Sequence, residues 1–147
     1  MKTSPVYFYV QKNQVFNDAT NFVPYDIPVV NIGNAIDLTT GVFKAPVKGK
    51  YFFSFSGLVH LTGTGKFWIS LMRNDVNMDG SSAVLTSTTD TGDSYQPVTL
   101  QATFDLIAGD RIAMKFTPGQ TPTNAELFDA AEHYTHFTGY LIEEAFA

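Results

Sequence analysis

Aromatic residues at alternate positions between Phe43 and Phe55 constrain the fold of this chain more than any other feature. Tyr51, Phe53 and Phe55 repeat with a period of two residues, and this spacing sends their rings to one face of a β-strand. Gly49 is expected to let the chain turn into that strand without steric cost. The segment therefore predicts a β-rich core on its own.

Other segments show the same alternation and predict an all-β fold. Apolar residues occupy every second position from Val98 to Leu106, as in a strand with one buried and one solvated face. Similar runs occur at 66–72, 111–117 and 134–142, and they are separated by turn-rich pieces such as 62–65. The single window with helical character, 124–132, has no consistent apolar stripe, so a loop or a single turn is expected there. Many short strands of this kind favour a sandwich or jelly roll.

Composition indicates one domain and excludes several classes of partner. The 147 residues are 44% hydrophobic, which suits one buried core, so we treat residues 1–147 as a single domain. A net charge of −5 without any basic cluster argues against binding to nucleic acid. The absence of cysteine excludes disulfides and thiolate metal sites. The apolar run 6–10 is too short for a signal peptide or for membrane insertion, which suggests a cytosolic protein or a mature or excised domain.

Several predicted strands are apolar on both faces, which indicates an interface between subunits. Phe52, Trp68, Tyr140 and Ile142 each point away from the main apolar face of their own strand. A monomeric sandwich rarely leaves this much apolar surface in water, so we predict that these four residues lie in a subunit interface. The alternative is that loops of the same chain cover some of the rings.

The chain resembles the globular head domain of complement C1q, which belongs to a superfamily shared with the tumour-necrosis-factor cytokines. The central motif of that family has Phe, five residues, Gly, and then aromatic residues at alternate positions, and Phe43, Gly49, Tyr51, Phe53 and Phe55 match it in register. Further segments resemble other signatures of the family in the same order and with the same spacing. These segments are 31–34, 37–41, 71–74, 108–112 and 137–141.

The resemblance implies a ten-stranded antiparallel jelly-roll sandwich that assembles as a compact homotrimer. It also implies an extracellular, secreted protein, although this chain shows no signal peptide. Three positions depart from the family pattern: Tyr25 replaces the usual Phe, Ile36 replaces an aromatic residue or Leu, and Ala45 replaces a Cys that vertebrate members often carry. The chain has no collagen tract, so the head must cluster in another way or bind as a lone trimer.

The residues argue against an enzyme, and no catalytic residue is expected. A metal-binding cupin needs a close His-x-His pair, whereas the spacing of His133 and His136 sends them to opposite faces of the predicted strand, and His60 stands apart. Composition leaves Ser-His-Asp chemistry open, but no serine lies in a Gly-x-Ser-x-Gly sequence. The segment 63–65 lacks the third glycine and the helix of a phosphate loop.

One run of oxygen-bearing residues resembles the first half of a calcium-binding loop. Asp75, Asn77 and Asp79 stand at ligand positions one, three and five and are followed by Gly80, but Thr86 replaces the required Glu at position twelve. An EF-hand is therefore excluded, and calcium at Asp75, Asn77 and Asp79 is the one cofactor hypothesis. The alternative is that the run makes tight turns. The same two interpretations apply to the pair Asp90 and Asp93.

These inferences favour a non-enzymatic, trimeric recognition module that binds glycans or microbial or cell-surface ligands multivalently, as a lectin of innate immunity does. Aromatic rings together with amides and carboxylates suit saccharides, and the predicted loops 74–79, 90–95 and 118–124 supply them. The alternatives are a cytokine-like ligand that trimerises a receptor and a structural trimerisation head of a larger protein. Candidate ligand-binding residues are Asn74, Asp75, Asn77, Asp79, Asp90, Asp93 and Tyr95.

Overall fold

The described part of the chain is built from antiparallel β-strands. The computed structural model describes residues 5–74, 76–86, 93–117 and 122–145, and these ranges contain ten strands and no helix. No helix of the described chain is therefore long and apolar enough to cross a membrane. The strands are β1 (Tyr7–Gln11), β2 (Ile27–Ile32), β3 (Ile36–Asp37), β4 (Val42–Lys44), β5 (Gly49–Arg73), β6 (Val76–Thr86), β7 (Asp93–Leu106), β8 (Arg111–Phe116), β9 (Thr123–Phe128) and β10 (His136–Glu144). Every pairing is antiparallel, so the predicted fold class is confirmed.

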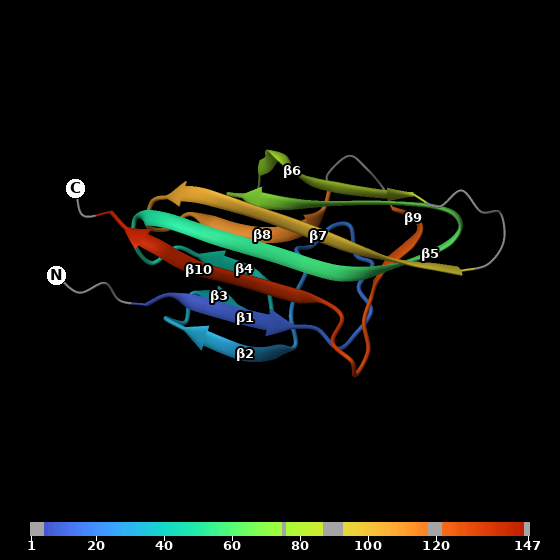
Figure 1. The fold of residues 1–147 in the computed structure, drawn as a ribbon, viewed down its shortest axis with the longest axis horizontal. Helices are drawn as coiled ribbons and strands as arrows, with labels where there is room; N and C mark the ends of the chain where they lie inside the picture. Colours follow the sequence, from blue (N-terminus) through green and yellow to red (C-terminus); the bar gives the residue numbers. More distant parts are fainter. Residues whose placement is uncertain (1–4, 75, 87–92, 118–121, 146–147) are drawn as a thin grey trace.

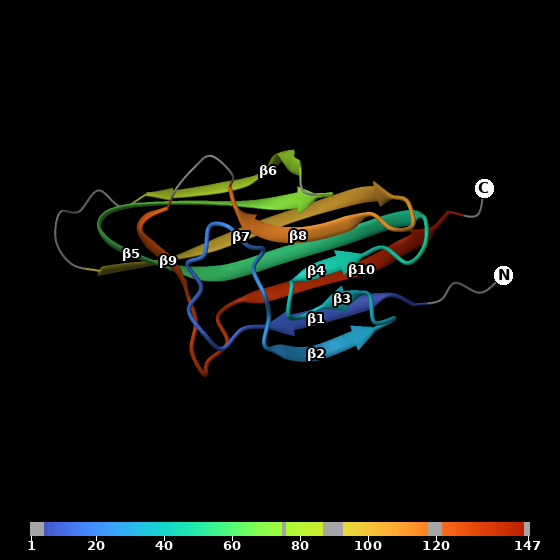
Figure 2. The same cartoon turned by 180° about the vertical axis from the view of Figure 1, so that it is seen from behind.

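The long strand β5 joins the two layers of the sandwich. Its residues up to Thr62 pair with β7 on one side and with β10 and β9 on the other, whereas those from Lys66 onward pair mainly with β6 and β8. The ribbon of β5 reverses direction between these two stretches (Figure 1), where the sequence predicted a turn at 62–65. Strands β10, β1 and β2 extend the first layer, and β4 and β3 extend the second. Figures 1 and 2 show the two layers from opposite sides.

The alternating aromatic residues of β5 form the centre of the core, as the sequence predicts. Tyr51, Phe53 and Phe55 are completely buried. Phe43, on β4 of the opposite layer, has its ring centroid 5.2 Å from that of Phe53 and 5.6 Å from that of Tyr51. The Tyr51 hydroxyl donates to the carbonyl of Val47 at 2.6 Å, so its polar group is satisfied. Because each buried ring contributes on the order of 2 kcal/mol, this cluster holds the layers together.

Two glycines are required by close packing between strands. A Cβ at Gly49 would collide with the carbonyl oxygen of Glu143 on β10 and would lie 2.9 Å from Leu141 Cδ1. Gly49 is not among the glycines with a positive φ, and the requirement for glycine comes from packing: the absent side chain makes room for β10 where its register with β5 shifts, between Leu141 and Glu143. At Gly139, a Cβ would overlap the Phe8 ring and lie 2.7 Å from Phe53 Cδ1.

The window 124–132 corrects a sequence prediction. Strand β9 covers Thr123–Phe128, and the non-strand structure expected for the whole window is present only at residues 129–132. Leu127 is completely buried and pairs with Val59, while Phe16 bonds to it from the other side. Short runs such as this take their structure from their partners, and these partners lie far away in the sequence.

Candidate self-association face and ligand cleft

A row of exposed aromatic residues crosses the outer face of the first layer. The strand register places Tyr7 of β1 opposite Tyr140 of β10, and Tyr140 opposite Phe52 of β5. The ring of Tyr140 lies 6.2 Å from that of Tyr7 and 5.4 Å from that of Phe52, centroid to centroid. Tyr7 is 39% exposed, Tyr140 is 40% exposed, and Ile142 on the same strand is 51% exposed. These four residues, Tyr7, Phe52, Tyr140 and Ile142, are called the aromatic row below, and they leave a contiguous apolar surface in contact with solvent.

Trp68 does not lie in the aromatic row. It follows the reversal of β5, so it belongs to the second layer, where it pairs with Val84 of β6. Its strand neighbours Phe67 and Ile69 are completely buried in the core, so Trp68 points to the outside of that layer. The four predicted interface residues therefore divide between opposite sides of the sandwich: three lie together, and Trp68 lies apart.

A polar cluster lies beside the aromatic row on the same outer face. The hydroxyl of Tyr9 is 2.6 Å from Nδ1 of His136, and the amide of Gln11 donates to that hydroxyl at 2.8 Å. The rings of Tyr9 and His136 are stacked with centroids 5.6 Å apart. Burial lowers the pKa of His136 below its ordinary value of 6.5, and His133 adds to that effect while Asp129 opposes it. A protonated His136 is thus disfavoured in the folded protein.

A cleft opens at the other end of this outer face. The register aligns Tyr95 of β7, His60 of β5 and Glu126 of β9 across three neighbouring strands. The ring of Tyr95 is 50% exposed and stacks on His60, with centroids 4.6 Å apart and planes inclined by 8°. His60 Nδ1 lies 3.2 Å from Glu126 Oε1. The cleft has a volume of about 370 Å³, and the residues that line it include Asn17, His60, Thr62, Pro122, Asn124 and Glu126.

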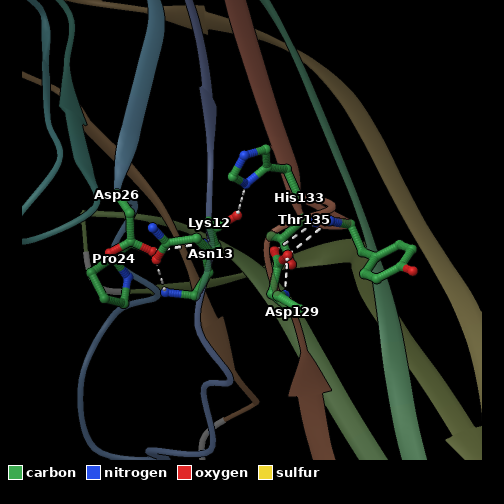
Figure 3. Close-up of polar contacts among 9 residues, drawn as sticks. Lys12, Asn13, Pro24, Asp26, Asp129, His133 and Thr135 are labelled. Atoms are coloured by element: carbon green, nitrogen blue, oxygen red, sulfur yellow. Dashed lines mark hydrogen bonds and ion pairs between the residues drawn. The ribbon is translucent and has the colours of Figure 1, made fainter.

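Buried charged groups fix the segments that follow β1 and β9, as Figure 3 shows. The carboxylate of Asp129, which follows β9, accepts hydrogen bonds from the backbone N–H groups of Ala130, Tyr134 and Thr135 at 2.8–2.9 Å. His133 has a φ of +59°, and its Nδ1 lies 2.9 Å from the carbonyl oxygen of Lys12, after β1. The connection between β9 and β10 is therefore tied to the segment after β1. His133 lies before β10, which corrects its predicted place in a strand with His136.

The ammonium of Lys12 completes this scaffold. It donates to the carbonyl of Pro24 at 3.0 Å and lies 3.7 Å from Asp26 Oδ2 (Figure 3). Burial lowers the pKa of Lys12, although the charges of Asp26 and Asp129 act in the opposite direction. Asp26 also accepts the backbone N–H of Asn13 at 2.9 Å. The segment after β1 is thus anchored before it reaches the cleft.

Asn74, a predicted ligand-binding residue, is engaged in local hydrogen bonds. Its amide donates to Asp110 Oδ1 at 2.9 Å, and its Oδ1 accepts the backbone N–H of Arg111 at 2.9 Å. Arg73 donates to the other oxygen of Asp110 at 3.0 Å. Burial raises the pKa of Asp110, but the hydrogen bonds from Asn74, Ile107 and Arg73 outweigh it, so the pKa lies below its ordinary value. Asn74 therefore links the end of β5 to the connection between β7 and β8.

The other predicted ligand and calcium residues lie on strands or outside the described residues. Asn77 and Asp79 lie on strand β6, where the sequence predicted a loop, and Asp93 begins β7. Asp75 and Asp90 lie outside the described residues. Within the described ranges, no group of three or more His, Asp or Glu side chains could hold a metal ion. Tyr95 stacks on His60, which is one of the residues that line the cleft.

Sequence reasoning missed the partners of Tyr95. Period-two spacing places His60 on the same strand face as Phe52. It does not reveal that β7 and β9 flank His60, and this pairing brings Tyr95 and Glu126 to it.

Comparisons with known proteins agree with this architecture. The family model of the C1q domain matches residues 7–142. Complement C1q tumor necrosis factor-related protein 3 is 26% identical over 129 residues in Mus musculus and 27% identical over 130 residues in Homo sapiens, covering 88% of this chain and 48% of each relative. Caprin-2 of Danio rerio is 25% identical over 120 residues, which are 82% of this chain and 12% of that protein. The chain thus spans about half the length, or less, of these relatives.

The same fold occurs in a solved structure. The globular domain of the zebrafish complement 1qA protein superposes with a TM-score of 0.66 and 18% sequence identity, covering 95% of this chain and 99% of that chain. The similarity extends along the whole sandwich, so the predicted jelly roll is confirmed.

Proposed function

This chain belongs to the C1q domain family, and from that premise we propose that it is a non-enzymatic homotrimer that recognises glycans on microbial or cell surfaces. C1q domains are typically trimeric modules for ligand recognition. The observation that carries the proposal is the aromatic row, which exposes Tyr7, Tyr140 and Ile142 on one face of the sheet. A surface of this kind needs a partner, and two further copies of the chain supply it.

The aromatic row defines how the proposed trimer packs. Phe52, Tyr140 and Ile142 enter the interface, while Trp68, on the opposite side, stays outside it. The polar cluster of Tyr9, Gln11 and His136 lies on the same face and supplies hydrogen-bonding groups beside the apolar contact. Apolar rings surrounded by satisfied polar groups are typical of stable protein interfaces.

Trimerisation gives the recognition mechanism. Three identical sites on one rigid body bind a repeated surface ligand with an avidity well above that of a single site, provided that the spacing of the ligand matches. Microbial and cell-surface glycans present repeated groups of this kind. Membership of the C1q family supports a secreted protein, and we propose that this one is secreted. Calcium at Asp75, Asn77 and Asp79 stays a prediction that a metal titration followed by thermal melting tests.

Two measurements test the proposal. Sedimentation equilibrium at micromolar concentration is expected to give three times the mass of the 16.2 kDa chain, and a monomer would overturn the assembly. A glycan array is expected to give binding that a free monosaccharide abolishes. A clean array together with tight binding to one cell-surface protein would instead identify a cytokine-like ligand. A trimer that binds neither would be a structural head.

A further inference from the structure

A groove lies at the edge of the second layer, apart from the cleft at His60. It has a volume of about 470 Å³, which suits a small ligand, and it opens between the segment that follows β1 and the turn that joins β3 to β4. Phe22 and Val42 are partly exposed, whereas Val23 and Phe43, the residues that follow them, are completely buried. This groove, called the edge groove below, is lined by Phe16, Asp18, Asn21, Phe22, Pro24, Thr39, Thr40 and Val42.

Backbone contacts hold the two walls of the edge groove together. The N–H of Tyr25 donates to the carbonyl of Leu38 at 2.9 Å. Gly41 has a φ of +74°, and a Cβ there would collide with the carbonyl oxygen of Val23, so the turn packs directly against the backbone of the other wall. The N–H of Val23 donates to the carbonyl of Met114 on β8 at 2.8 Å, which ties that wall to the sheet. A groove with fixed walls loses little conformational freedom when a ligand binds.

The two aromatic rings of the edge groove already have cations beside them. The ammonium of Lys12 lies 5.5 Å from the centroid of the Phe16 ring, and the ammonium of Lys115 lies 5.6 Å from the centroid of the Phe22 ring. Neither lysine lines the groove itself. A positively charged ligand would therefore compete with two ammonium groups that the chain supplies.

The rim of the edge groove carries a carboxylate and an amide in a fixed arrangement. Asp18 Oδ1 accepts the backbone N–H and the hydroxyl of Thr20 at 2.8 and 2.6 Å, and Asp18 Oδ2 accepts Nδ2 of Asn21 at 2.7 Å. The hydroxyl of Thr20, its N–H and the Asn21 amide lower the pKa of Asp18 from 3.8 to about 2, so this carboxylate is charged at neutral pH. The amide oxygen of Asn21 can accept a further hydrogen bond. On the opposite wall, Thr39 and Thr40 are exposed and add two hydroxyl groups.

These features disfavour charged and wholly apolar ligands. The carboxylate of Asp18 repels an anion, and the lysines beside the rings compete with a cation. A wholly apolar ligand would remove water from the carboxylate and the amide without replacing its hydrogen bonds. A neutral sugar has C–H groups that pack on apolar side chains and hydroxyl groups that both donate and accept. We therefore infer that the edge groove binds one neutral hexose of a glycan. This inference rests on the proposed function and gives it a location.

The edge groove stays open when the aromatic row is covered. Val42 lies on β4 and Val23 bonds to β8, and both strands belong to the second layer. The aromatic row lies on the outer face of the first layer. A trimer that packs through the aromatic row would thus carry three accessible grooves, and a surface with repeated sugars could occupy several of them at once.

The test uses the full chain on an array that carries neutral, sialylated and unacetylated amino sugars, followed by calorimetry with the methyl glycoside of the strongest neutral hit. Asn21→Ala removes the rim amide at an exposed position and is expected to weaken monovalent binding roughly fivefold, as for the loss of one hydrogen bond. Phe22→Leu keeps an apolar side chain but removes the ring, and it should weaken binding about as much. Asn17→Ala is the matched control, because this exposed asparagine lines the cleft at His60 instead, and binding should be unchanged.

Different failures have different meanings. If the wild type binds a glycan and both Asn21→Ala and Phe22→Leu bind it with the same affinity, the site lies elsewhere while the proposed function stands. If Asn17→Ala alone weakens binding, the site is the cleft at His60. Preferred binding of sialylated or amino sugars would also overturn the inference. If the wild type binds no glycan, the proposed function itself fails. Should Phe22→Leu not fold, Asn21→Ala decides the question by itself, because its side chain is exposed.

Discussion

Replacing Gly139 with alanine tests how tightly the two layers pack. Gly139 lies in the middle of β10 and faces the core, where a Cβ would overlap the ring of Phe8 and lie 2.7 Å from Phe53 Cδ1. Both rings are completely or almost completely buried, so neither can move into solvent. Adding atoms to such a core costs about 1–3 kcal/mol. For a chain of this size, that corresponds to a fall of roughly 3–9 °C in Tm.

A double-mutant cycle separates the collision from other effects. Phe8→Leu alone is expected to cost about 1–2 kcal/mol because it removes part of a buried ring. In the double variant Gly139→Ala/Phe8→Leu, the smaller side chain makes room, so the combined cost should be less than the sum. Gly109→Ala is the control: no heavy atom lies within 4 Å of its Cβ, but its φ of +95° makes the cost one of backbone strain, about 1 kcal/mol. That cost should simply add to the cost of Phe8→Leu.

The assays are thermal melting and urea unfolding, both followed by near-ultraviolet circular dichroism, at one fixed protein concentration because assembly shifts the apparent stability. The reasoning is refuted if Gly139→Ala melts within 1 °C of the wild type. It is also refuted if Gly139→Ala and Phe8→Leu are strictly additive, since the two sites would then not be in contact.

Three further predictions concern the aromatic row, the pH dependence of stability and the hydrogen bonds of Asp129. Tyr140→Lys should convert the trimer to monomer in sedimentation, whereas Trp68→Lys, on the opposite side, should leave it assembled. The reverse result would place the subunit interface on the outer face of the second layer. Since burial lowers the pKa of His136 below 6.5, the unfolded chain takes up a proton first as the pH falls. Tm should then decrease from pH 6.5 down to the lower folded pKa, and His136→Gln should flatten that decrease. Asp129→Ala leaves three backbone N–H groups without their acceptor and should cost at least about 3 kcal/mol in urea unfolding; a cost below 1 kcal/mol would show that water replaces the carboxylate.

The core was predictable from the sequence because its signal is local. Tyr51, Phe53 and Phe55 alternate within one strand, and a strand buries one face whatever its partners are, so their burial follows from spacing. The motif around Gly139 was recognisable for the same reason. The reason for a glycine at this position was not predictable, because the rings that leave no room for a side chain come from β1 and β5.

The outer faces were not predictable in the same way. Phe52 and Trp68 both oppose the buried face of β5, and spacing alone gives them the same role. The reversal of β5 between Thr62 and Lys66 places them in different layers, so only Phe52 joins Tyr140. A reversal of the chain changes which surface a residue faces without changing its neighbours in sequence.

The sequence by itself determined which residues are buried and to which family the chain belongs, since both depend on patterns within single strands. The tertiary structure decided which exposed side chains from different strands lie together. His60, Tyr95 and Glu126 lie between 31 and 66 residues apart in the chain, and they meet because antiparallel pairing sets β7, β5 and β9 side by side. Pairing between distant strands depends on the whole fold. A group of side chains contributed by several strands therefore cannot be recognised in the sequence of any single strand.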